Sequence, residues 1–197
     1  MKLGENETID VQCAILHRIL KQNTALYQVI RNLYRLNLND CYVGGGCVFQ
    51  TVWNYQMGFE PNYGITDIDL IYFDDSDLSE DAENKAIIRV QQAFHDVPYT
   101  FDVKNEARVH LWYKRKFGID ISPYTSSESA INTWPTVVSS VGVYHDGKNF
   151  KIYAPYGLND MFGRIVRANK LLITQDVFEK KAAKWKSKWN DITVLDW

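Results

Sequence analysis

The chain has 197 residues, a length that suits one domain with one well-filled core. Hydrophobic residues make up 46% of it, and 22 Lys and Arg nearly balance 24 Asp and Glu, giving a formal net charge of −2. This is the composition of a globular protein, and it argues against strong general binding of nucleic acid. Three cysteines without a CxxC pair favour reduced thiols over disulfides or a zinc site. Without an apolar run that could span a bilayer or serve as a secretory leader, we expect a cytoplasmic protein with no membrane partner.

The N-terminal segment, residues 1–40, has the pattern of two helices. Apolar residues recur at helical spacing between Thr8 and Leu36, and Asn23-Thr24 interrupts the pattern. Thr24 suits the N-cap of the second helix, because its hydroxyl can accept a hydrogen bond from a backbone N–H.

Three consecutive glycines, Gly44 to Gly46, follow a short expected strand at 41–43. A helix is expected after them, at 48–57, ending at Gly58. Three adjacent glycines suit a backbone that turns sharply or comes very close to another group. A tight turn meets that description, and so does a cradle in which the first N–H groups of a helix bind phosphate.

Two expected strands carry aspartates within apolar sequence. Asp67 and Asp69 lie two apart in the strand at 65–73, so both point to one face, and Asp102 alternates with apolar neighbours in the strand at 98–105. Asp is depleted in strands, which suggests a compensating role, although an exposed edge also accounts for such a pair taken alone. If the strands are neighbours, the three carboxylates converge, and a hard cation such as Mg²⁺ would offset their repulsion. Two such ions could clamp an in-line displacement at phosphorus, with Mn²⁺ as an alternative metal.

Helices are expected after both of these strands. The first has its N-cap at Asp77 or Ser79 and runs to about His95, and the second ends at Gly118. Lys104 and Arg108, close to the third aspartate, are candidates for phosphate contacts, with a solvated salt bridge as the alternative for each.

The C-terminal part, residues 119–197, begins with a short helix that ends before Pro135. A hairpin with an Asp146-Gly147 turn follows, and then two closing helices, at about 158–170 and 177–192. The last helix carries five lysines and two tryptophans at helical spacing. An RNA-binding stripe is one interpretation. A closing helix that packs its tryptophans and solvates its lysines is favoured.

The order Gly-Gly, then "TDIDLIY", then a third acidic residue in "TFDVK" resembles the nucleotidyltransferase superfamily, which includes DNA polymerase beta, CCA-adding enzymes and aminoglycoside nucleotidyltransferases. The segments "TDIDLIYFDDSDLSEDAE", "DVKNEARVHLWYKRKFG", "SSESAINTWP" and "IYAPYGLNDMF" look like those of a bacterial family of nucleotidyltransferase-like proteins with no established substrate. This closer resemblance extends from about Gly44 to the C-terminus.

The resemblance implies an α/β fold in which a mixed sheet is flanked by helices. A core at 41–118 would be followed by the C-terminal hairpin and closing helices, all in a single domain at 1–197. It also implies transfer of a nucleoside monophosphate from an NTP to an acceptor, with release of pyrophosphate. Asp67, Asp69 and Asp102 would hold two Mg²⁺ ions and carry catalysis, and Asp102 would also activate the acceptor hydroxyl.

The glycines would then bind the nucleotide, with Gly45 and Gly46 lining the triphosphate. The acceptor, whether a small molecule, a protein side chain or an RNA end, stays open. The alternative is a non-catalytic module that binds a nucleotide or a protein partner on the same scaffold.

Overall fold

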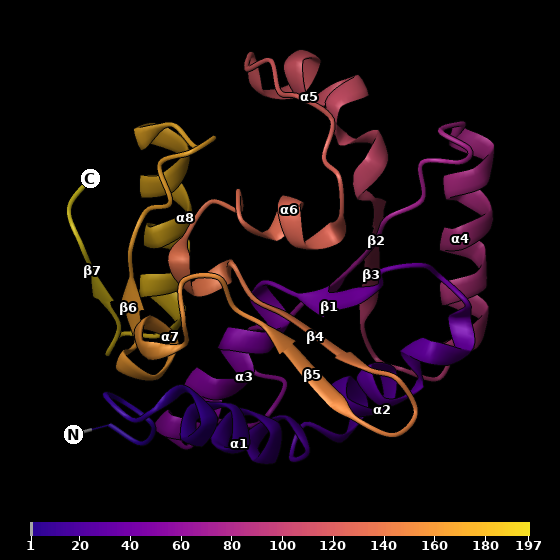
Figure 1. Cartoon of the computed structure of the whole chain (residues 1–197). Helices are drawn as coiled ribbons and strands as arrows, with labels where there is room; N and C mark the ends of the chain where they lie inside the picture. The colour runs from indigo at the N-terminus through magenta and orange to yellow at the C-terminus, as the bar shows by residue number, and fades with distance from the viewer. Residues whose placement is uncertain (1) are drawn as a thin grey trace.

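A five-stranded mixed sheet lies at the centre of the computed structural model, which describes residues 2–197 (Figure 1). Its strand order is β3-β2-β1-β4-β5, and only β2 and β3 run parallel. The strands are β1 (Tyr42–Gly44), β2 (Asp67–Tyr72), β3 (Thr100–Asn105), β4 (Gly142–His145) and β5 (Phe150–Tyr153). The expected mixed sheet and the β4–β5 hairpin are therefore confirmed.

The strand register aligns the residues that the sequence singled out. Gly44 of β1 pairs with Asp69 of β2, and Asp69 pairs in turn with Asp102 of β3. Gly44 also pairs with Gly142 of β4 on its other side. Because paired residues point to the same face of a sheet, Asp69 and Asp102 project together, as the sequence predicted for neighbouring strands.

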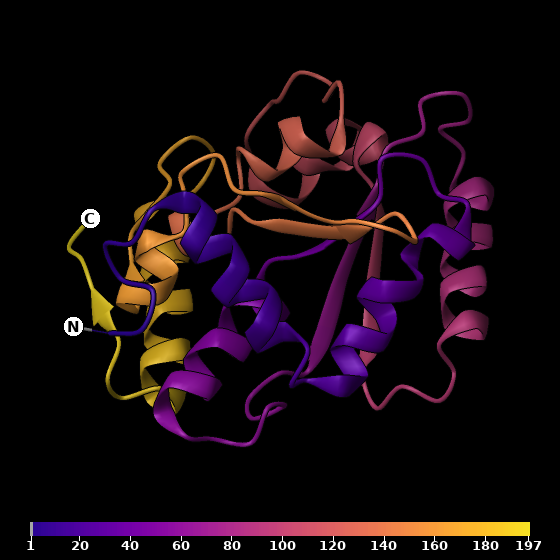
Figure 2. The ribbon, with the colours of Figure 1, turned by 60° about the horizontal axis from the view of Figure 1, so that its bottom comes forward.

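One face of the sheet is covered by the N-terminal helices and the helix after the glycines (Figure 2). In this layer α1 contacts α3, α2 contacts β4, and α3 contacts β2. A further helix, α4, packs beside β3 at the sheet edge. These elements are α1 (Ile9–Leu20), α2 (Thr24–Asn32), the 3₁₀ turn η1 (Leu33–Leu36), α3 (Gly46–Met57) and α4 (Glu80–Ala93).

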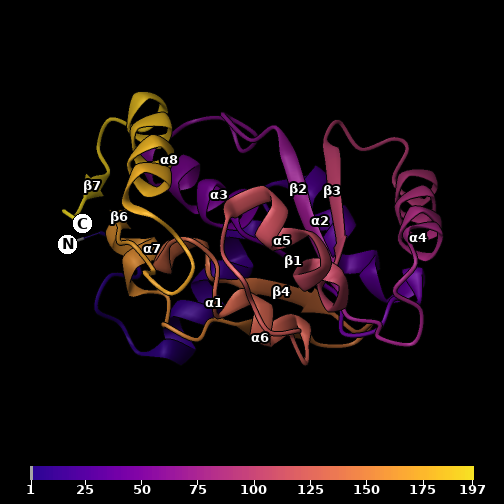
Figure 3. The ribbon, with the colours of Figure 1, turned by 90° about the horizontal axis from the view of Figure 1, so that it is seen from above.

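The other face carries α5, seen from above in Figure 3, with α6 beside it and α8 at one end of the sheet. A small parallel sheet of β6 and β7 lies next to α8 (Figure 1). The elements are η2 (Glu106–Arg108), α5 (Val109–Phe117), α6 (Ser127–Ile131), η3 (Val137–Ser139), α7 (Asn159–Gly163), β6 (Ile165–Val166), α8 (Gln175–Lys188) and β7 (Thr193–Val194).

Aromatic packing fixes α8 against α3. Trp185 packs edge-on against Phe49 and Trp53, and the fully buried Trp189 packs against Trp53. The Trp189 Nε1–H also donates to the Asn54 side chain at 2.7 Å. The interpretation of α8 as a closing helix that packs its tryptophans is confirmed, and this packing sets which lysines of α8 face the sheet.

Two expectations are wrong in detail. Asn23, not Thr24, caps α2, because its side chain accepts from the Leu26 N–H at 3.2 Å while its amide donates to Thr51. The helix expected at about 158–170 ends at Gly163, where Arg164 takes a left-handed conformation (φ 56°) and the chain turns into β6.

Other boundaries follow the sequence. Ser79 caps α4, Gly58 and Gly118 end α3 and α5 in left-handed conformations, and Gly147 gives the hairpin turn its positive φ.

The three cysteines are free thiols. Among residues 2–197, no helix has both the length and the apolar character that crossing a bilayer requires.

Candidate functional site

A cavity of about 460 Å³ opens between the sheet, the start of α3, α5 and α8. Six predicted site residues line it: Gly45, Gly46, Asp67, Asp69, Asp102 and Lys104. We call it the aspartate cavity. Segments far apart in the sequence therefore meet at one place, on the face of the sheet to which the aspartates point.

Asp69 is the most perturbed of the three carboxylates. It is partly buried between the exposed Asp67 and Asp102. Burial, followed by the charges of these two neighbours, raises the pKa of Asp69 to about 7, although the Gly46 N–H and Lys181 act in the opposite direction. The pKa is therefore raised mainly because the carboxyl is removed from water, and the two neighbouring carboxylates add to this shift.

The outer two aspartates are each held by a neighbour. Asp67 accepts a hydrogen bond from Thr66 Oγ1, and Asp102 forms an ion pair with Lys104, two residues along β3. Within residues 2–197, no three His, Cys, Asp or Glu side chains already surround a common metal position. The carboxylates share a face and offer the hard oxygen donors that Mg²⁺ prefers, so the donor set fits this ion.

A side chain would meet a different obstacle at each of the three glycines of the turn. At Gly44, an added Cβ would lie 2.5 Å from the Val141 carbonyl oxygen and 2.7 Å from the Trp134 ring. Gly45 has a φ of +64°, and a Cβ there would lie 2.8 Å from Asp69 Oδ2. At Gly46, a Cβ would meet only the end of the flexible Gln50 side chain, at 3.1 Å. Of the three glycines, Gly45 is therefore the one that brings the turn directly beside the central carboxylate.

The turn also presents the start of a helix to the cavity. Gly45 is the N-cap of α3, and Gly46 and Cys47 form its first turn, whose N–H groups have no acceptor within the helix. Cys47 is buried, and its thiol donates to the Gly44 carbonyl at 3.3 Å. Backbone N–H groups at the positive end of a 12-residue helix are suited to bind phosphate.

The structure does not bring two predicted nucleotide-binding residues into the aspartate cavity. Gly44 is buried in β1 between β2 and β4. Arg108 is only 6% exposed, forms an ion pair with Glu83 of α4, and donates to the Leu78 carbonyl at 2.8 Å. Its guanidinium anchors η2 to α4, a buried contact in place of the solvated salt bridge that was the alternative.

Three lysines of α8, Lys181, Lys184 and Lys188, line the cavity opposite the aspartates. By contrast, Lys180 forms an ion pair with Asp176 along the helix surface. Burial lowers the pKa of Lys181, although Asp69 acts in the opposite direction. We expected these lysines to be solvated, but their spacing of three and four residues places them on one helix face, and this face lines the cavity.

A fourth acid, Glu106, was also missed. It follows Asp102 and Lys104 at strand spacing and lines the aspartate cavity, although it is only 6% exposed. Burial raises the pKa of Glu106 to about 8, and Lys104 opposes the shift. The period-two alternation of charged residues at 102, 104 and 106 was the signal that could have identified it.

Comparison with known proteins agrees with this geometry. Among solved structures, the chain is similar to a protein whose NMR structure is described as revealing a CCA-adding enzyme head domain. The TM-score is 0.74 and the sequence identity 22%, over 92% of this chain and 95% of that chain. This likeness confirms the predicted nucleotidyltransferase-type fold. No curated protein sequence matches the chain. The sequence model of a family described as nucleotidyltransferase matches residues 31–194, most of the chain, and the chain therefore belongs to this nucleotidyltransferase family.

Proposed function

We propose that the protein transfers a nucleoside monophosphate from an NTP to an acceptor hydroxyl in a reaction that depends on Mg²⁺. The acceptor oxygen forms a bond to the α-phosphorus, the bond from that phosphorus to the bridging oxygen breaks, and pyrophosphate leaves. The hydroxyl proton passes to a carboxylate. Family membership supports this reaction class, and the residues of the aspartate cavity support the assignment of roles.

The triphosphate binds between the start of α3 and α8. The N–H groups of Gly46 and Cys47 provide donors for phosphate oxygens, and Lys181 and Lys184 provide positive charge from the opposite wall. Lysines at this position stabilise the charge that develops on pyrophosphate as it leaves.

Asp67, Asp69 and Asp102 would hold the metal ions, through carboxylate oxygens on one face of β2 and β3. When bound, Mg²⁺ supplies charge neutralisation and polarisation at the reacting phosphate. The raised pKa of Asp69 supports this role, because a bound cation would offset both the burial of the carboxylate and its repulsion by Asp67 and Asp102.

Asp102 is the residue to accept the acceptor proton, since it lies on the strand farthest from the glycines. Before substrate binds, its carboxylate forms an ion pair with Lys104. When Asp102 turns toward the reacting groups, the Lys104 ammonium becomes available for a phosphate oxygen within the same cavity.

The observation that carries the proposal is the strand register. Gly44, Asp69 and Asp102 are paired across β1, β2 and β3, so the start of α3 lies beside the carboxylates. The test supplies α-labelled NTPs, Mg²⁺ and a pool of small metabolites, and measures labelled product together with pyrophosphate. Wild type and the surface control Asp75→Asn should turn over, whereas Asp102→Asn should bind NTP without turnover. Equal turnover by Asp102→Asn would contradict the proposal. If wild type binds NTP without turnover and Asp102→Asn binds it with the same affinity, the non-catalytic nucleotide-binding alternative is favoured.

A further inference from the structure

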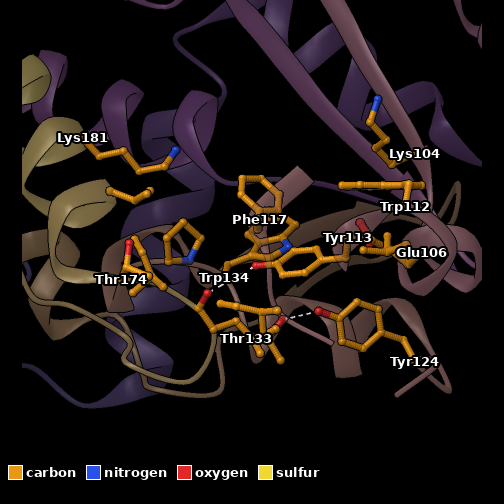
Figure 4. Close-up of a pocket in the computed structure, with 16 residues that line it drawn as sticks. Lys104, Glu106, Trp112, Tyr113, Phe117, Tyr124, Thr133, Trp134, Thr174 and Lys181 are labelled. Carbon is orange, nitrogen blue, oxygen red and sulfur yellow. Dashed lines mark hydrogen bonds between the residues drawn. The ribbon is translucent and has the colours of Figure 1, made fainter. Parts of the chain in front are cut away.

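A second cavity, of about 250 Å³, lies beside the aspartate cavity, between α5, the segment after α6 and the start of α8 (Figure 4). Aromatic side chains dominate its wall: Trp112, Tyr113, Phe117, Tyr124 and Trp134. We call it the aromatic cavity. The two spaces adjoin, because seven residues line both of them: Lys104, Glu106, Trp112, Phe117, Trp134, Pro135 and Lys181.

The tyrosine hydroxyls of the aromatic cavity are already hydrogen-bonded. Tyr124 Oη and Thr133 Oγ1 lie 2.6 Å apart in a hydrogen bond, drawn dashed in Figure 4. Tyr113 donates to the Leu172 carbonyl at 3.4 Å. Burial raises the pKa of Tyr124 to about 12, so this hydroxyl remains neutral. Apart from the charged side chains at the junction with the aspartate cavity, the wall offers mainly ring and aliphatic surface, which favours a flat apolar group.

The aromatic cavity reaches from the start of α8 to the residues that follow Asp102. On its wall, Trp134 also lies against the glycine turn, since a Cβ on Gly44 would lie 2.7 Å from the Trp134 ring. At the other end, Lys104 of β3 and Glu106 of η2 open into the cavity. In an in-line displacement the acceptor approaches opposite the leaving pyrophosphate, and that side is β3, where Asp102 lies, so the acceptor would enter from this end.

From these observations we infer that the aromatic cavity binds the acceptor, a small molecule that carries an aromatic ring and a hydroxyl. The inference rests on the proposed transferase activity and specifies its second substrate class. The ring lies among Trp112, Phe117 and Trp134, and the hydroxyl reaches toward Asp102. Glu106, at the junction of the two cavities, is placed to bond a polar substituent between the ring and the hydroxyl.

The test substitutes larger side chains on the far wall of the aromatic cavity, at residues that do not line the aspartate cavity. Val177→Phe and Thr174→Phe both add a ring there, and the Thr174 side chain makes no capping bond that the change would remove. Leu171→Phe is the matched control, because Leu171 is 61% exposed and lies outside the cavity wall. The probe is 2-phenylethanol, followed by tryptophan fluorescence, and binding of each NTP with Mg²⁺ is measured by calorimetry.

Wild type and Leu171→Phe should bind 2-phenylethanol, and the two filled variants should bind it at least about tenfold more weakly. All of these proteins should bind NTP with similar affinity. Weaker NTP binding in both filled variants would overturn the inference, because the cavity would then hold the nucleoside. Absence of probe binding in wild type would also overturn it. If wild type binds the probe but no NTP, the proposed function fails while the ring site stands.

Discussion

Without a bound metal, the charge of the central carboxylate, Asp69, should lower the free energy of unfolding of the protein. Burial and the charges of Asp67 and Asp102 raise the pKa of Asp69 from 3.8 to about 7. As the pH rises above about 4, the unfolded chain loses this proton before the folded protein does. The contribution of the Asp69 proton to the free energy of unfolding is therefore present at low pH and is lost as the pH rises to about 7.

The size of the effect follows from the pKa. Each pKa unit corresponds to about 1.4 kcal/mol, so the interval between pH 5 and the Asp69 pKa of about 7 is worth at most about 3 kcal/mol. Because Asp69 keeps some contact with solvent, we expect the stability lost over this pH interval to be about 1 to 3 kcal/mol. The substitution Asp69→Asn keeps the shape of the side chain and removes the charge. Glu106, which also has a raised pKa, is present in both proteins, so most of its effect cancels in the comparison.

The assay is urea unfolding in EDTA at pH 5 and pH 8. The stability of Asp69→Asn relative to wild type should increase by about 1 to 3 kcal/mol between these pH values. The exposed substitution Asp75→Asn should show no such change. If Asp69→Asn and wild type share the same pH dependence, or if the variant is less stable relative to wild type at pH 8 than at pH 5, Asp69 does not carry a raised pKa of this size.

Three further changes separate the roles of backbone, charge and buried ion pair. Gly45→Ala should abolish NTP binding, measured by calorimetry. By urea unfolding it should also destabilise the fold by more than the roughly 1 kcal/mol expected for Gly118→Ala, because both glycines have a positive φ but only a Cβ at Gly45 is crowded. Lys181→Ala should weaken NTP binding by about tenfold, with a smaller salt dependence, whereas Lys180→Ala should leave the affinity unchanged. Arg108→Ala should cost about 3 to 5 kcal/mol of stability by urea unfolding and leave the NTP affinity of the folded protein unaltered; weaker binding at intact stability would contradict its assignment to the scaffold.

Local patterns in the sequence were sufficient to predict most of the sheet and the three aspartates. Strand alternation placed Asp67 and Asp69 on one face, and Asp102 joined them on the condition that the two strands are neighbours, which the structure meets. The glycine triplet marked the strand-to-helix junction, because adjacent glycines suit a backbone that turns sharply or approaches another group closely. These features depend on neighbours in the sequence, which is why they could be predicted.

The missed residues depend on tertiary packing. Arg108 was assigned to phosphate from its proximity to Asp102, but the position of α4 brings Glu83 to it and buries the pair. Conversely, the lysines of α8 face the aspartates because Trp185 and Trp189 pack against α3. The aromatic cavity forms between α5 and α8, whose sequences are more than 50 residues apart. No spacing within a single segment could reveal that contact.

Calorimetry tests whether the aspartates and the start of α3 form a metal-dependent nucleotide site. Each NTP is titrated into wild type with Mg²⁺ and with EDTA, beside the double variant Asp67→Asn, Asp69→Asn. We predict binding that requires Mg²⁺ and is lost in the double variant, even though the variant is folded and at least as stable as wild type in EDTA. Nucleotide binding of equal affinity in the double variant, or absence of NTP binding by folded wild type, would contradict the claim.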